Sequence, residues 1–188
     1  MNLKSIALAA VAALAMTSLQ ASASSFTINF DQVGIGAQVG NFYNGDNVGT
    51  DFGVSFNDYY TVSGFGETSQ PNLAYVGGNT GIIDVAGGFR AVSFTYGNFT
   101  SATYNVWSGL DGTGALLGTT TLTGDPRAFS AGSVLFSGNA HSLVMLGGAG
   151  QMGIDDLKLT TTVPEPASVG LMLAGLALVG ASVRRRKA

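Results

Sequence analysis

Cysteine is absent from the 188 residues, and histidine occurs once, at His141. Without cysteine the chain can form neither a disulfide nor a thiolate zinc site, and one histidine excludes a histidine-rich zinc site. Charged residues are also scarce, at 10% of the chain. A folded domain of this composition therefore depends on close packing, or on a metal ion held by oxygen ligands.

Basic side chains are almost missing from the long middle of the chain. Residues 24–162 contain ten acidic side chains, a net charge of −7, because they hold only three basic ones, Arg90, Arg127 and Lys158. This balance disfavours binding to nucleic acid or to anionic lipid, and it suits divalent cations. We therefore expect no nucleic-acid partner.

Residues suited to catalysis are few as well. A Ser-His-Asp triad would have to use His141, and no nucleophile-elbow pattern accompanies it. Glycoside hydrolysis needs two carboxyl groups in a cleft, yet Glu67 is the one glutamate in residues 24–162. A secreted hydrolase is therefore disfavoured, and it stays as an alternative.

The N-terminus has the three parts of a secretory signal peptide. Lys4 supplies a basic start, an apolar run extends from Ile6 to Met16, and Ala21-Ser22-Ala23 forms a small-residue cleavage site. The run is too short to span a bilayer as a resident helix. We expect export by the Sec machinery and cleavage after Ala23. An uncleaved N-terminal anchor is the alternative.

The C-terminus combines a proline-flanked glutamate, an apolar run and a basic end. Val163, Pro164, Glu165 and Pro166 precede an uncharged run from Ala167 to Val183, which is followed by Arg184, Arg185, Arg186 and Lys187. At about 1.5 Å per residue this run reaches roughly 25 Å, the short limit for a transmembrane helix. The positive-inside rule keeps the basic end in the cytoplasm, so the extended Pro-Glu-Pro strip faces outward, where a processing enzyme can read it.

This ending, Val163 to Ala188, resembles the PEP-CTERM sorting signal of Gram-negative bacteria. The resemblance implies recognition by an exosortase, a membrane-embedded cysteine protease or transpeptidase, through the Pro-Glu-Pro strip and the arginines. It also implies a transient inner-membrane anchor, loss of the tail, and delivery to the cell surface or to the exopolysaccharide matrix of a biofilm. A plain tail anchor is the alternative.

The expected organisation of the chain has three parts. Residues 1–23 form the signal peptide, residues 24–162 one exported domain, and residues 163–188 the sorting signal. Within the sorting signal we expect a transmembrane helix at 167–183 and a basic tail at 184–187.

The pattern of residues 24–162 is all-β. Short runs rich in Val, Ile, Thr, Phe and Tyr are separated by Gly, Asn and Asp turns, and no helix-length amphipathic stretch occurs. The run 91–96, for example, places Val92, Phe94 and Tyr96 on one face. This spacing predicts a two-sheet sandwich of the jelly-roll kind. Pieces such as INFD at 28–31 and GIDDLKL at 153–159 resemble an extracellular domain found ahead of PEP-CTERM tails, which implies a fold and a location but no reaction.

The last expected strand changes register in its middle, at Asp155-Asp156. Two pairs of apolar residues flank the aspartates and alternate inward, namely Met152 with Ile154 and Leu157 with Leu159. A slip of one residue between two inward-facing pairs is typical of a β-bulge, which redirects the side chains at the bulge.

The same two aspartates are candidate ligands for a metal ion. Asp31 follows the first expected strand, and in jelly rolls the terminal strands commonly lie side by side, so Asp31 is expected to approach Asp155 or Asp156. Carboxylate oxygens with backbone carbonyls are calcium ligands. The sequence thus indicates a structural Ca²⁺ at Asp31, Asp155 and Asp156, and a solvated bulge without an ion is the alternative.

Three aromatic residues, Trp107, Tyr59 and Tyr60, are candidates for a sugar-stacking platform, because aromatic rings suit the apolar faces of pyranoses. Aromatic side chains half-buried in the sandwich are the alternative. Together these observations predict an exported, non-enzymatic protein with a structural or adhesive role on exopolysaccharide or another surface glycan. The alternatives are a specific glycan-binding module and the secreted hydrolase.

Processing at both ends can be measured directly. Intact-mass analysis of the exported protein should show a start near Ser24 and an end between Pro164 and Pro166, because the signal peptidase and the exosortase remove the flanking segments. A mature form that retains Arg184 to Lys187 would contradict exosortase processing.

Overall fold

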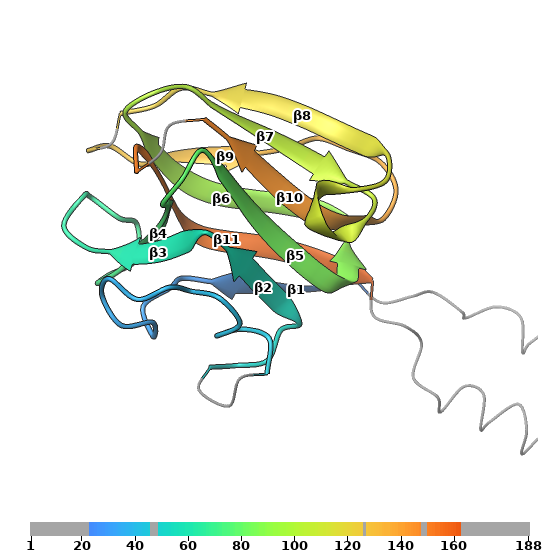
Figure 1. Cartoon of the computed structure of the whole chain (residues 1–188), viewed down its shortest axis with the longest axis horizontal. Helices are drawn as coiled ribbons and strands as arrows, with labels where there is room; N and C mark the ends of the chain where they lie inside the picture. Colours follow the sequence, from blue (N-terminus) through green and yellow to red (C-terminus); the bar gives the residue numbers. More distant parts are fainter. Residues whose placement is uncertain (1–22, 46–48, 126, 148–149, 163–188) are drawn as a thin grey trace, which may run out of the picture. The chain divides into compact units, whose positions relative to one another are not determined.

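The computed structural model describes four stretches of the chain, residues 23–45, 49–125, 127–147 and 150–162 (Figure 1). They form one compact unit, Ser24–Thr162. Residues 1–22 of the expected signal peptide, 1–23, and the whole expected sorting signal, 163–188, lie outside the described residues. Within the described stretches, no helix is long and apolar enough to cross a membrane.

The strands of the described residues form two sheets that pack face to face (Figure 1). Sheet A has the order β3-β4-β11-β6-β9, with β1 also paired to β11. Its strands are β1 (Ala23–Ile28), β3 (Tyr59–Val62), β4 (Leu73–Val76), β6 (Ala91–Asn98), β9 (Ser130–Ser133) and β11 (Met152–Thr162). Sheet B has the order β2-β5-β10-β7-β8. Its strands are β2 (Val54–Asn57), β5 (Thr80–Phe89), β7 (Ala102–Trp107), β8 (Leu116–Leu122) and β10 (Ala140–Leu146).

The predicted all-β sandwich of two sheets is confirmed. From β4 to β11 the chain passes back and forth between the sheets, so that β4-β11-β6-β9 faces β5-β10-β7-β8. This is the strand order of an eight-stranded jelly roll, with β1, β2 and β3 added at the sides. The one short helical turn described, η1 (Leu110–Gly112), lies between β7 and β8. As expected, the first and last strands pair, because β1 lies beside β11.

The core lies between the sheets and is built from alternate residues of the strands. Val92, Phe94 and Tyr96 of β6 all point inward, as the alternation predicts, and each is buried. The ring of Phe94 lies 4.8 Å, centroid to centroid, from that of Tyr104 in sheet B. Contacts of this kind join the two sheets without any disulfide.

The bulge predicted at Asp155-Asp156 is also confirmed. Against β6, Asp155 pairs with Thr95 but Lys158 pairs with Ser93, so β11 contains one extra residue at this point. Asp156 takes a positive φ of 47°, the left-handed conformation that aspartate tolerates better than most residues. The slip keeps both apolar pairs in the core, where Met152, Ile154, Leu157 and Leu159 are all at most 1% exposed.

Candidate binding groove

The outer face of sheet A, the face turned away from the core, carries a groove of about 300 Å³. Its floor comes from β4, β6 and β11, and its sides come from the end of β3 and from several loops, one of them the segment between β1 and β2. Its aromatic lining residues are Phe65, Tyr75, Phe99 and Phe129. We call this feature the aromatic groove.

Two glycines in adjacent strands make the floor of the aromatic groove. Gly97 of β6 and Gly153 of β11 are register partners. A Cβ atom on Gly97 would lie 2.6 Å from the ring of Phe129, and one on Gly153 would lie 2.7 Å from Leu73. Glycine inside a strand often marks a place where another group approaches the backbone closely. Here the missing side chains allow Phe129 to lie over the sheet.

The rim of the aromatic groove exposes large apolar side chains. Phe65 is 42% exposed, Phe99 53% and Ile35 66%, although most apolar side chains of the domain are buried. The backbone N–H of Phe99 donates to the carbonyl of Gln151 at 2.8 Å, which fixes this rim residue to the segment that leads into β11. An apolar hollow with a few polar groups at its edge is the usual form of a ligand site.

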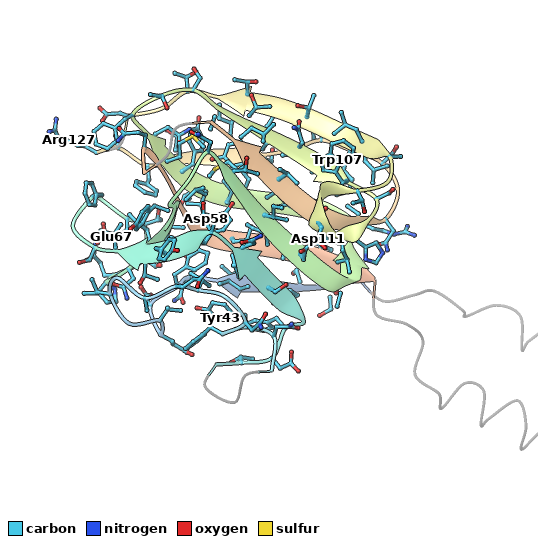
Figure 2. The ribbon with its side chains drawn as sticks, in the orientation of Figure 1. Tyr43, Asp58, Glu67, Trp107, Asp111 and Arg127 are labelled. Atoms are coloured by element: carbon cyan, nitrogen blue, oxygen red, sulfur yellow. The ribbon has the colours of Figure 1, made fainter. Side chains whose placement is uncertain are left out.

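Glu67 organises the loop that carries Phe65. Its Oε1 accepts the N–H of Gly64 and its Oε2 accepts the N–H of Phe65, both at 2.8 Å. Burial raises the pKa of Glu67, but its backbone N–H donors together outweigh this effect, so the pKa lies below its ordinary value of 4.5. Gly66 packs on the loop between β8 and β9. A Cβ atom on Gly66 would lie 2.9 Å from the carbonyl oxygen of Arg127 in that loop. Figure 2 shows Glu67 and Arg127 at the same end of the sandwich.

The carboxylate of Asp155 fixes the other part of this loop to sheet A. The side chain is fully buried, and its Oδ2 accepts the backbone N–H of Ser69 at 2.8 Å. Its Oδ1 accepts the hydroxyl of Ser69 at 3.0 Å and the N–H of Asp156 at 2.7 Å. Burial raises the pKa of Asp155, and the hydrogen bonds from Ser69 and Asp156 oppose that rise. Nearby, the hydroxyl of Thr68 donates to that of Thr95 at 2.8 Å.

Asp31 contacts the same loop at Asn72, three residues after Ser69. Its Oδ1 accepts the backbone N–H of Asn72 at 3.0 Å. Two of the three predicted calcium ligands, Asp31 and Asp155, thus meet at one loop, and N–H and O–H donors contact their carboxylates. Asp156 lies instead on a separate hollow that Tyr43 also lines. Among the described residues no group of three or more His, Asp or Glu side chains could hold a metal ion. Calcium stays a prediction that this geometry does not support.

The three aromatic residues predicted as a sugar platform do not lie together. Tyr59 is fully buried against Phe56, so its role as a platform is wrong. The alternation of β3 turns Tyr60 outward instead, where its ring lies 6.0 Å from that of Tyr75 beside the aromatic groove. Trp107 is half-buried on sheet B, and Figure 2 shows it well away from Glu67 and Arg127.

Sequence reasoning missed most of the groove. Its aromatic residues Phe65, Phe99 and Phe129 lie in loops, where alternation carries no information about exposure. One signal was available in Gly97 and Gly153, which interrupt otherwise apolar strands and so mark positions of close approach.

Comparison with known proteins identifies the C-terminal segment. Residues 162–187 match the family model of the PEP-CTERM protein-sorting motif, so the chain carries the motif that its ending resembles. No curated protein matches the sequence significantly.

Several solved structures share a distant similarity with the chain. One is the K2 cleaved adhesin domain of Lys-gingipain, with 12% identity over 73% of this chain and 100% of that one, at a TM-score of 0.48. Another is a family 29 carbohydrate-binding module from Piromyces equi, with 10% identity over 74% of this chain and 91% of that one, at a TM-score of 0.42. Similarities at this level carry no argument about what this chain binds.

Replacing Asp155 by alanine should destabilise the domain strongly. The N–H groups of Ser69 and Asp156 would lose their acceptor in a buried site, so the free energy of unfolding should fall by about 2 kcal/mol or more. Urea unfolding followed by Trp107 fluorescence measures this loss. Asp156→Asn is the matched control, because asparagine also tolerates a positive φ, and it should change stability by less than about 0.5 kcal/mol.

The same measurement tests the predicted calcium ion. If hydrogen bonds alone hold the loop, Asp155→Ala has the same effect in chelator and in calcium. A calcium-specific stabilisation of the wild type that disappears in the variant would show instead that Asp155 is a ligand.

Acid should remove the contribution of Glu67 to stability. Because its pKa in the folded protein lies below 4.5, the ionised side chain stabilises the fold fully above that pH. This contribution is lost as the pH falls through the lower pKa of the folded state. The stability difference between wild type and Glu67→Gln, measured by urea unfolding, should therefore shrink as the pH falls below 4.5. A difference that grows on acidification would contradict this account.

Proposed function

We propose that this chain is a non-catalytic adhesive protein of the cell surface or extracellular matrix. An exosortase delivers it, and its domain holds polysaccharide in the aromatic groove. The PEP-CTERM motif at residues 162–187 supports this destination. The observation that carries the binding role is the aromatic groove itself, an open apolar hollow with a glycine floor.

The shape of the groove suits a sugar chain. A pyranose ring has an apolar face and a rim of hydroxyl groups, so it combines well with aromatic rings and nearby polar groups. Phe65 and Phe99 present exposed rings, and Gln151 supplies an amide at the edge of the hollow. Gly97 and Gly153 leave room for the ring of Phe129 on the sheet, so the bottom of the groove also presents an aromatic surface.

Two observations support binding rather than hydrolysis. Both carboxylate oxygens of Glu67 accept backbone N–H groups, and its lowered pKa disfavours the protonated form that a general acid needs. The ring of His141 lies at 3.3 Å from the carbonyl of Val85 and at 3.1 Å from the amide of Asn139, away from the groove lining. The secreted hydrolase therefore stays the weaker alternative.

Loss of one rim aromatic should weaken retention on glycan. Phe99→Ala removes an exposed ring of the aromatic groove, and affinity for a neutral glucan should fall about tenfold, the effect of one stacking contact of ~1.5 kcal/mol. Affinity electrophoresis of the exported protein in gels containing the glucan measures this change. Leu116→Ala is the matched control, because Leu116 is similarly exposed, at 49%, and lies outside the groove.

Trp107→Ala separates the two possible platforms. Its retention should equal that of the wild type if the groove on sheet A binds the glycan. Loss of retention in Trp107→Ala with no change in Phe99→Ala would overturn the groove assignment. Release of sugar products by the wild type, abolished in Glu67→Gln or His141→Ala, would overturn the non-catalytic role.

A further inference from the structure

A second hollow of about 380 Å³ lies by the start of β6 and the C-terminal half of β11. Arg90 and Lys158 line it, and they are two of the three basic residues in residues 24–162. Hydroxyl groups complete its polar lining, from Ser93, Ser133 and Thr160, and no Asp or Glu is among the residues that form it. We call this feature the basic hollow.

The sheet brings both basic residues to neighbouring backbone positions, because Lys158 lies in β11 and Arg90 lies in the bend between β5 and β6. Lys158 of β11 is the register partner of Ser93 in β6. The backbone N–H of Arg90 donates to the carbonyl of Thr160 at 2.7 Å. Arg90 therefore contacts β11 two residues beyond Lys158. The two cations therefore reach one hollow from fixed backbone positions.

The local charge of the basic hollow is opposite to that of the domain. At physiological ionic strength the Debye length is about 8 Å, so acidic side chains further away are largely screened from a ligand in the hollow. An anion there meets two cations and no lining carboxylate. Arginine offers a planar fork of donors that matches a carboxylate or sulfate, and lysine adds a mobile point charge.

We propose that the basic hollow is an anion subsite, which takes the carboxylate or sulfate group of an acidic polysaccharide. That the anion belongs to a polysaccharide rests on the proposed function. Leu135, which is 89% exposed at the edge of the hollow, provides an apolar surface for the body of a sugar ring next to the charged group.

The aromatic groove and the basic hollow lie along the same strand. Ala91, Ser93, Thr95 and Gly97 alternate onto the outer face of β6, with Ser93 in the hollow and Gly97 in the groove. Four residues of a strand span about 13 Å, and the loop that Thr95 and Asp155 hold lies between the two sites, so a polysaccharide chain that contacts both passes over this loop. Specificity then has two parts, because the groove takes sugar rings in general and the hollow selects chains that carry an anion.

The test compares polygalacturonate, a polymer of uronic acid, with a neutral glucan as ligands of the exported protein. Arg90→Gln and Lys158→Gln should each lower the affinity for polygalacturonate by about tenfold, the effect of losing a charge-assisted hydrogen bond, and leave that for the glucan unchanged. Arg127→Gln is the matched control, since it removes the same charge outside the hollow, and it should keep wild-type affinity for both. Melting curves check that all variants are folded.

Each other outcome counts against one proposal. If Arg90→Gln and Lys158→Gln both keep wild-type affinity for polygalacturonate, the subsite is wrong, and the groove is unaffected. If Arg127→Gln weakens binding as much as Arg90→Gln, only the total charge matters, and the subsite is again wrong. If Phe99→Ala changes neither affinity while Arg90→Gln lowers that for polygalacturonate, the subsite stands and the groove proposal fails. Capture by phosphatidylglycerol vesicles that depends on Arg90, without binding to polygalacturonate, would assign the hollow to lipid and overturn the proposal.

Discussion

The outer face of sheet A depends on the hydrogen bonds that the buried carboxylate of Asp155 accepts from Ser69. Ser69 donates to it with both its backbone N–H and its hydroxyl, so a loop distant in the sequence is fixed across the strands. The bulge makes this possible, because one extra residue at Asp156 lets the apolar residues before and after it stay in the core. The wall of the aromatic groove that carries Phe65 belongs to this fixed loop.

Missing side chains matter as much as those present. Gly97 and Gly153 leave a strip of bare backbone in the middle of sheet A, and Phe129 lies over it where a Cβ would collide. The same face carries the basic hollow at its other end, where Arg90 and Lys158 stand without a lining carboxylate. A single face thus combines an apolar and a cationic surface, although the domain as a whole is acidic.

Strand features could be predicted from the sequence, because they follow from local alternation. The inward residues of β6, the slip at Asp155-Asp156 and the pairing of the first and last strands all agree with the structure. Contacts made by loops could not be predicted, since they depend on which distant segments meet. Asp31 and Asp155 do come to one place, yet the groups they meet there are N–H and O–H donors of a loop. Tyr59 and Tyr60 are adjacent in β3, yet Tyr59 is buried in the core and Tyr60 points outward.

The central claim is that the outer face of sheet A binds sugar chains, and mapping a bound oligosaccharide by NMR tests it most directly. Titration of the labelled protein with a neutral gluco-oligosaccharide should shift the backbone amides of Gly97 and Gly153 and the ring signals of Phe99 and Phe129. The indole N–H of Trp107, on sheet B, should stay unchanged. Shifts centred on Trp107, or none at saturating sugar, would contradict the account.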